Sequence, residues 1–447
     1  MSEGSTAPPS AELERLAEIA SEVLKLARAR GAEQAEVSLS VDQGLNVNVR
    51  LGEVETLEHT RDRGLSLTVY IQQRKGSATT ADLAPASIAA TLDQALNIAR
   101  FTEADPCAGL AEAGMLASAF PDLDLWHPWS ISADEAIELA RSCEQAGMTD
   151  PRIRNSEGAA VSTQSGYGIY ANSHGFIGRE HGTSHSLSVS LIAGPDDAME
   201  RDYWYDSKRS AADLQNAQYI GAEAARRTLA RLDARKLSTR TAPVLYVPEL
   251  SGGLIGGLIG AVSGGAQYRK ASFLLDAVGQ KLLPDWFRVH EQPHLKRAMG
   301  SANFDNEGVA THASDLVTAG VLVRYVLSSY SARKLGLRST GNAGGVHNLT
   351  VQANAGELSD MLQKMHTGLM VTELMGQGVN PITGDYSRGA AGFWVENGQI
   401  AYPVAEITIA GNLKDIYRNL VAVGSDVNER GSIRTGSILV EQMTIAG

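Results

Sequence analysis

The spacing of apolar residues changes from a helical to a strand period early in the chain. Between residues 11 and 30, apolar positions recur every three or four residues, and Gly31 stands where a helix C-terminal cap is expected. From residue 37 to residue 71, apolar and polar residues alternate, which predicts an antiparallel meander. Three glycines divide its runs: Gly44, Gly52 and Gly64. A second helix should follow, with Ile88, Leu92, Ala95 and Ala99 on one face.

The same order of elements returns after a stretch rich in proline and aspartate at residues 121–128. Ser132 and Glu135 have the spacing of a capping box, and the helix that they begin should end at Gly147. Strand alternation resumes over residues 159–192, and a long helix is predicted over residues 210–235. The order therefore predicts two related α+β units, although no residue-level repeat links them.

A third unit begins near residue 241. An apolar strand at residues 244–247 leads into a glycine-rich helix or loop from Ser251, and residues 358–365 form one more amphipathic helix. From residue 392 to residue 445, short strands separated by glycines predict a curved, largely antiparallel sheet. The predicted fold class is α+β, with two helix-plus-antiparallel-meander units at residues 1–120 and 121–238 and a strand-rich C-terminal domain at residues 239–447.

Charge and composition restrict the classes of partner. A chain of 447 residues with 43% hydrophobic content can bury the cores of two or three domains. Its net charge is −12, and such a field repels a phosphate backbone unless basic residues gather on one face. The one basic stretch, residues 226–236, has helical spacing and is interpreted as a solvated helix face. The sequence thus predicts no direct nucleic-acid partner.

The N-terminal residues and the lengths of the apolar runs predict a cytoplasmic protein. The first residues lack the basic start and apolar stretch of a secretory signal. The most apolar run, residues 250–266, contains seven glycines and is shorter than the roughly 20 residues that span a membrane. Cys107 and Cys143 are too few for a disulfide scaffold and are expected as reduced thiols.

One string has the form of a zinc-protease motif. His290-Glu291-Gln292-Pro293-His294 matches H-E-x-x-H, in which two histidines on one helix face bind zinc and the glutamate is the general base. Pro293 would break that helix at a cost of about 3 kcal/mol. Residues 286–289 favour a strand. We interpret His290, Glu291 and His294 as a chance match on a surface strand or loop.

A glycine cluster allows two interpretations. Gly252, Gly253, Gly256 and Gly257 match neither the phosphate-binding patterns G-x-x-x-x-G-K-[ST] and G-x-G-x-x-G nor the G-x-S-x-G elbow of serine hydrolases. They would let a helix pack closely on a sheet, or leave main-chain groups open to an extended peptide. These four glycines are the predicted peptide-binding residues.

Several strings in the C-terminal third resemble the PmbA/TldD family, and they occur in the family's order. Because the helix and meander order is similar too, the resemblance covers essentially the whole chain. It implies a subunit of a bacterial zinc metalloprotease, from a family once described as modulators of DNA gyrase. The strings are Arg338-Ser339-Thr340-Gly341-Asn342-Ala343, Gly384-Asp385-Tyr386-Ser387-Arg388-Gly389, Val395-Glu396-Asn397-Gly398, Pro403-Val404 and Gly411-Asn412.

The resemblance also separates two branches. It implies that TldD-like catalytic members carry H-E-x-x-x-H on a helix of the third unit and a cysteine near the C-terminus. Here the corresponding helix is residues 253–261, which holds glycines and aliphatic residues, and no cysteine follows Cys143. Residues 431–434 stand near the expected cysteine. The chain therefore resembles the PmbA (TldE) branch, with no catalytic residue, no metal ligand and no cofactor of its own, and zinc is expected in a TldD-like partner.

What the resemblance implies is a heteromeric protease that acts on unfolded peptides, among them a peptide-antibiotic precursor and an antitoxin. Any link to DNA gyrase would be indirect. Two alternatives stay open: a peptide-binding scaffold without proteolysis, and a protease with its own zinc at His290 and His294. The sequence does not decide whether the chain forms a homodimer when the partner is missing, although a surface shaped for a related chain is often partly self-complementary.

Overall fold

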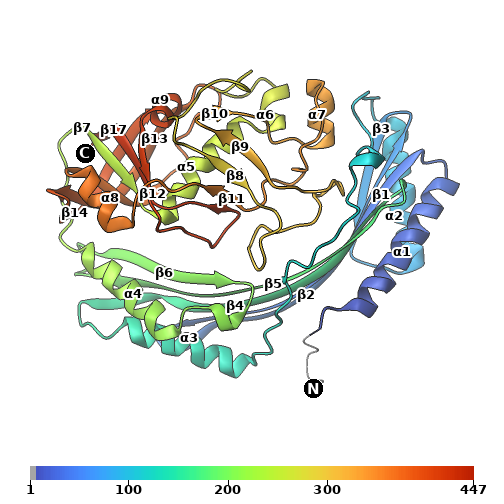
Figure 1. The fold of residues 1–447 in the computed structure, drawn as a ribbon. Coiled ribbons are helices and arrows are strands. Elements are labelled where there is room, and N and C mark those ends of the chain that lie inside the picture. The colour runs from blue at the N-terminus through green and yellow to red at the C-terminus, as the bar shows by residue number, and fades with distance from the viewer. Residues whose placement is uncertain (1–6) are drawn as a thin grey trace.

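The computed structural model describes residues 7–447. A curved, antiparallel six-stranded sheet wraps around one side of the C-terminal domain, and four helices cover its convex face (Figure 1). The strand order is β3-β2-β1-β4-β5-β6. The strands are β1 Gln34–Arg50, β2 Glu53–Ile71, β3 Arg74–Thr80, β4 Ile153–Asn172, β5 Ile177–Ala193 and β6 Glu200–Lys208, and the helices are α1 Ser10–Ala29, α2 Pro85–Phe101, α3 Ala133–Gly147 and α4 Ala217–Ala230.

The strands of the two predicted units form one sheet. The strand β1 pairs with β2 on one side and with β4 on the other, so Leu39 lies opposite both Leu65 and Ile169. Two apolar cores lie beneath the helices, one under α1 and α2 and the other under α3 and α4. The first two units are thus joined through continuous main-chain pairing rather than through a linker alone.

The structure confirms the predicted helices and corrects several bounds. Ser132 and Glu135 form both hydrogen bonds of the capping box. Gly44 and Gly64 do not end strands, because β1 and β2 run through them, and only Gly52, with φ +82°, makes a turn. The long helix predicted over residues 210–235 is shorter: a 3-10 turn at Ala211–Asp213 precedes α4.

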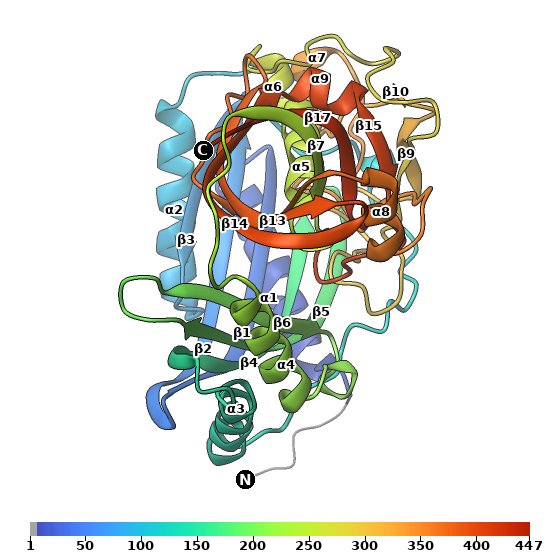
Figure 2. The same cartoon turned by 90° about the vertical axis from the view of Figure 1, so that its left-hand side faces the viewer.

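The C-terminal domain contains a closed sheet. Its order is β14-β13-β12-β7-β17-β15, and β14 also pairs with β17, which closes the sheet into a barrel (Figure 2). The strands after residue 392 are longer than expected, since β14 alone has 14 residues. The barrel strands are β7 Arg240–Tyr246, β12 Gly368–Met375, β13 Asp385–Glu396, β14 Gln399–Asn412, β15 Leu420–Val423 and β17 Ile438–Ala446.

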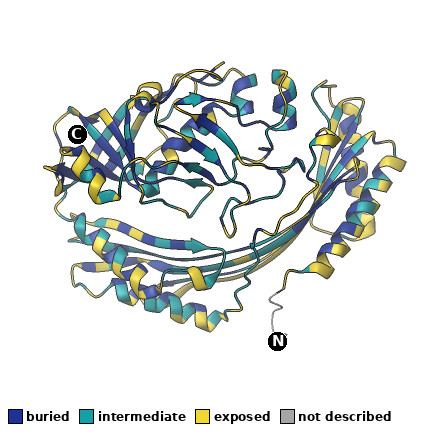
Figure 3. Cartoon of the chain, viewed as in Figure 1, coloured by how far each residue is buried: buried dark blue, intermediate teal, exposed yellow. Residues whose placement is uncertain are grey.

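A smaller sheet and five helices complete this domain. The sheet has the order β10-β9-β8-β11-β16. Buried residues fill the domain, whereas exposed ones follow the outer sides of the helices on the large sheet (Figure 3). Along residues 7–447, no helix combines the length and apolarity that crossing a membrane requires. The elements are β8 Val289–Glu291, β9 Ser314–Thr318, β10 Val321–Leu322, β11 Leu349–Val351, β16 Ile433–Arg434, α5 Pro248–Ala261, α6 Gly264–Tyr268, α7 Ser329–Leu335, α8 Leu358–Met365 and α9 Leu413–Arg418.

Candidate functional site

The concave face of the large sheet is polar and faces the C-terminal domain. Successive residues of a strand point to opposite faces. In β1, Val37 and Leu39 are 0% and 1% exposed in the core beneath the helices, whereas Glu36 and Ser38 lie on the other face. Two cavities lie between this polar face and the C-terminal domain, one of 850 Å³ and one of 1,320 Å³. This cleft is the candidate functional site.

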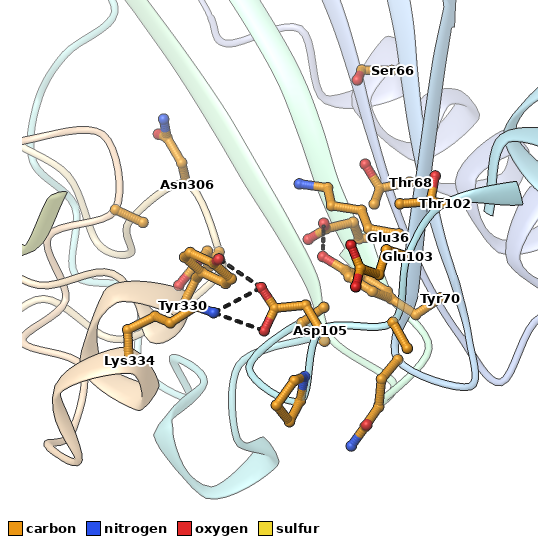
Figure 4. Close-up of a pocket in the computed structure, with 18 of the residues that line it drawn as sticks. Glu36, Ser66, Thr68, Tyr70, Thr102, Glu103, Asp105, Asn306, Tyr330 and Lys334 are labelled. Atoms are coloured by element: carbon orange, nitrogen blue, oxygen red, sulfur yellow. Dashed lines mark hydrogen bonds and ion pairs between the residues drawn. The ribbon is translucent and has the colours of Figure 1, made fainter. Parts of the chain in front are cut away.

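The smaller cavity, here called the acidic cavity, lies over β1, β2 and β3. Residues 102–109, which follow α2, and α7 of the C-terminal domain form its other walls (Figure 4). Its volume falls in the range of about 300–1,000 Å³ typical of ligand pockets. Its charged lining residues are Glu36, Glu103, Asp105 and Glu307 against Lys75 and Lys334.

Glu36 is held by two tyrosines on the floor of the acidic cavity. Tyr70 donates its hydroxyl to Oε1 at 3.0 Å, and Tyr170 donates to Oε2 at 2.7 Å. Burial raises the pKa of Glu36, while the two tyrosine hydrogen bonds and Lys75 oppose this shift. Burial and the neighbouring Glu36 charge raise the pKa of both tyrosines well above the ordinary value, so both stay protonated donors.

Asp105 joins the wall of the acidic cavity to the C-terminal domain. Its carboxylate accepts hydrogen bonds from the Tyr330 hydroxyl at 2.7 Å, from Lys334 Nζ at 3.0 Å and from the Cys107 amide at 2.9 Å. The Tyr330 hydrogen bond, followed by the other two, lowers the pKa of Asp105 to about 2. Asp105 is therefore ionised at neutral pH and fixes residues 102–109 against α7.

The larger cavity, here called the sheet cavity, lies over β1, β4 and β5. Segments at residues 120–125 and 301–306 line its other side. Within the described chain, His181 Nδ1, Arg209 Nε and Asn303 Oδ1 have no hydrogen-bond partner although they are buried. The sheet face contributes serine, glutamine, asparagine and aspartate side chains, namely Ser40, Asp42, Gln43, Asn46, Gln164 and Ser165. Such groups can bond to a main chain of any sequence.

The predicted peptide-binding glycines lie on the helix α5 and line neither cavity. A Cβ atom at Gly252 or Gly253 would meet nothing within 4 Å, and one at Gly256 would only reach Ile433 at 4.0 Å. At Gly257 a Cβ atom would lie 3.0 Å from the Tyr417 hydroxyl. Because main-chain groups within a helix bond to one another, these glycines offer bare Cα surface rather than free donors. Their part in peptide binding stays a prediction.

The H-E-x-x-H string begins in the strand β8, although of residues 286–289 only Val289 belongs to that strand. It is not on the surface, however, because Glu291 is 2% exposed and forms an ion pair with Arg324. Glu291 also accepts hydrogen bonds from Asn342 Nδ2 at 2.9 Å and from the His347 amide at 2.5 Å. His290 Nδ1 lies 2.6 Å from Asp315 Oδ1.

These residues do not form a set of zinc ligands. Arg324, Asn342 and the His347 amide all bind the Glu291 carboxylate, so it is not free to act as a general base beside a metal. In the part of the chain that the structure describes, no group of three or more His, Cys, Asp or Glu side chains could hold a metal ion.

The sequence did not predict the acidic cavity. Its residues come from β1, β2, β3, β4, the segment after α2, residues 306–307 and α7, so no short motif contains them. One signal was available: Glu36 and Ser38 are the polar positions that alternate with the apolar Val37 and Leu39. That signal places them on a face but cannot show what covers it.

Comparisons with known proteins agree with this architecture. Residues 35–99, 126–232 and 239–447 match, in order, PmbA/TldA metallopeptidase domain 1, the central domain and the C-terminal domain. The chain is 52% identical to Metalloprotease PmbA of Escherichia coli O157:H7 over 97% of this chain and 96% of that protein. It is 23% identical to the Metalloprotease TldD homolog of Buchnera aphidicola subsp. Acyrthosiphon pisum over 46% of this chain and 45% of that one.

Two solved structures have the same fold. A proposed modulator of DNA gyrase from Bacteroides thetaiotaomicron superposes with a TM-score of 0.92 at 29% identity, covering 96% of this chain and 98% of that one. TldE from Thermococcus kodakarensis superposes with a TM-score of 0.84, covering 96% and 100%, and at 20% identity it shows the fold alone. With all three domains matched in order and a relative 52% identical along nearly all of both chains, this chain belongs to the PmbA/TldD family of metallopeptidases.

Proposed function

We propose that this chain is the non-catalytic, PmbA/TldE-type subunit of a zinc metalloprotease that degrades unfolded peptides in the cytoplasm. A TldD-like subunit would supply the zinc. The observation that carries the proposal is the chemistry of α5, the helix after β7, where the resemblance places H-E-x-x-x-H in catalytic members. Its buried face holds Leu254, Ile255 and Leu258, and its open face holds glycines, none of which can bind a metal ion.

The contacts of Glu291 in the H-E-x-x-H string support the same proposal. A general base of a zinc protease must be free to take a proton from a metal-bound water. Glu291 instead compensates the buried charge of Arg324 and binds Asn342, which belongs to a string that carries the family resemblance. Removing one partner of such a buried pair is costly, so Glu291 is interpreted as a structural residue.

The cleft gives this non-catalytic subunit a function of its own, namely binding of the peptide. The polar face of β1, β4 and β5 offers side-chain donors and acceptors along the sheet cavity. The cavity is lined by both acidic and basic residues. An extended peptide can bond to such groups through its main chain, with little preference for sequence. A folded domain would not enter, because its main-chain groups are already bonded internally. Selection of unfolded substrates follows from this requirement.

Reconstitution tests the proposal. This chain, a TldD-like chain and their equimolar mixture are each incubated with an unstructured peptide, and cleavage is followed by mass spectrometry. We expect cleavage in the mixture only, and no stoichiometric zinc in this chain by elemental analysis. Cleavage by this chain alone, or about one zinc per chain that is lost in His290→Ala, would contradict the proposal. Copurification without cleavage in any mixture would instead support a peptide-binding scaffold.

A further inference from the structure

Four carboxylates but only two lysine ammonium groups line the acidic cavity. Of its two lysines, Lys334 is engaged by Asp105. Lys75 is then the remaining lysine of the lining beside Glu36, Glu103 and Glu307, and the charge of Arg333 acts on Tyr70 from outside the lining. The Glu307 charge acts on the same group, since it opposes ionisation of Glu36. A ligand that enters this cavity is therefore favoured if it brings a positive charge.

The Glu36 side chain is held in place by hydrogen bonds from two tyrosines. Two tyrosine hydroxyls fix the two carboxylate oxygens, and each of these oxygens keeps a further lone pair for a ligand donor. Figure 4 shows Glu36, Tyr70 and Glu103 on the sheet side, with Asp105, Tyr330 and Lys334 opposite. Tyrosine rings beside carboxylates suit an organic cation, because the ring face also attracts positive charge.

Asn172 adds an observation that does not depend on the acidic residues. It lies opposite Glu36 in the β1–β4 register, so both side chains share one face of the sheet. Asn172 is 1% exposed, and its Nδ2, beside the Tyr170 hydroxyl, has no acceptor in hydrogen-bonding geometry among the described residues. Asn172 does not line the acidic cavity, so its amide supports Tyr170 beneath Glu36 and is not a contact for the ligand itself.

We propose that the acidic cavity binds the alkylammonium group of a peptide, with Glu36 as its counter-ion. The shared chemistry has two sources, the α-amino terminus and a lysine side chain. That the carrier is a peptide rests on the proposed function, whereas ammonium binding does not. A divalent cation fits less well, since no group of three carboxylates or imidazoles in residues 7–447 is close enough to hold one.

Binding to the isolated full-length chain tests the inference. The probes are a fluorescent unstructured peptide with a free amino terminus, its amino-acetylated form, and a form with each lysine replaced by norleucine. Glu36→Gln removes the charge and keeps the shape. Glu53→Gln is the matched control, because Glu53 is an exposed residue of β2 outside both cavities. Thermal melts of the variants check that each is folded.

We expect Glu36→Gln to weaken binding of the free peptide roughly tenfold or more, with Glu53→Gln unchanged. If acetylation alone gives the same loss, the ammonium is the α-amino terminus; if lysine replacement alone does, it is the side chain. Equal binding of all three peptides, or a folded Glu36→Gln that binds like the unmodified chain, would overturn the inference.

A smaller probe separates this inference from the proposed function. Butylammonium is titrated into the unmodified chain and into Glu36→Gln, and tyrosine signals are followed by NMR. Shifts that require Glu36 support the ammonium site even if no mixture cleaves peptides. Absence of such shifts, in a chain that does support cleavage with its partner, would reject the ammonium site and leave the proposed function standing.

Discussion

The two faces of the large sheet are made by the same strands and have opposite chemistry. On the convex face, Val37, Leu67 and Val69 are 0% exposed and pack beneath α1 and α2. On the concave face, Glu36, Ser38 and Thr68 line the acidic cavity. The difference shows how the fold separates its tasks: burial of apolar area on one face stabilises the sheet, and the other face is left free for recognition.

The largest expected effect is a loss of stability when a buried side chain of the convex face is removed. Leu67→Ala removes a fully buried side chain and leaves a cavity, so the free energy of unfolding should fall by about 2–5 kcal/mol. Urea denaturation followed by circular dichroism measures it. If the faces are independent, the variant protein that remains folded should bind peptide with unchanged affinity. A loss of affinity in fully folded Leu67→Ala would show that the faces are coupled.

The next effect concerns the wall of the concave cleft and depends on pH. The pKa of Asp105 lies at about 2 in the folded chain, below its ordinary 3.8. A depressed pKa means that the stability from this carboxylate is fully present above pH 3.8 and is lost as pH falls toward 2. The side chain is 30% exposed, so after discounting for solvent we expect Asp105→Asn to cost roughly 1 kcal/mol at neutral pH.

Melting temperatures of the unmodified chain and of Asp105→Asn between pH 2 and pH 6 check this expectation. The difference between the two proteins should shrink as the pH falls through the window named above. A difference that stays constant down to pH 2 would show that the Asp105 charge contributes nothing to the contact with Tyr330 and Lys334.

Substitutions in a third region, the helix α5, test whether peptide recognition is confined to the concave face. Gly253 lies in the interior of α5 with open space around it. Gly253→Ala should raise stability by about 0.5–1 kcal/mol, since glycine is a poor helix former. Gly253→Leu and Gly256→Leu should weaken peptide cleavage by the mixed complex, while assembly stays intact by size-exclusion chromatography. Unmodified cleavage by both leucine variants would make these glycines structural.

Gly257→Leu provides the contrast within α5. Its side chain would press on the buried Tyr417, whose hydroxyl donates to the Leu254 carbonyl at 2.9 Å. We expect this variant to lose stability, because overpacking forces neighbouring side chains to move. Equal thermal melts for Gly257→Leu and Gly253→Leu would show that the space around Tyr417 is larger than the structure indicates.

The smallest effect is expected on the concave face itself. Ser38→Ala changes an exposed position of β1 that is not part of the apolar core. Stability should stay within about 0.5 kcal/mol, as at most surface sites. Urea denaturation compares it directly with Leu67→Ala. A loss above 1 kcal/mol in Ser38→Ala would mean that the concave face also contributes to folding, and the division between the faces would fail.

Much of the fold could be read from local patterns. The helices at α1, α2, α3 and α8 were predicted because their apolar residues repeat with a helical period, and the α3 cap because Ser132 and Glu135 bond within one turn. The bounds of β1 and β2 could not be read in this way. Gly44 and Gly64 permit a turn, but only pairing with neighbouring strands decides that both strands continue.

The sequence by itself determined the family, the alternation that makes one face of each strand polar, and the lack of metal-binding side chains in residues 253–261. Those properties depend on residue type and short spacing. Tertiary structure alone decided that Asp105 meets Tyr330, 225 positions away, and that Glu36 lies between Tyr70 and Tyr170. The curvature of the sheet and its packing against the C-terminal domain create the acidic cavity. Because contacts so distant in sequence form only when separate elements pack together, no local period encodes them.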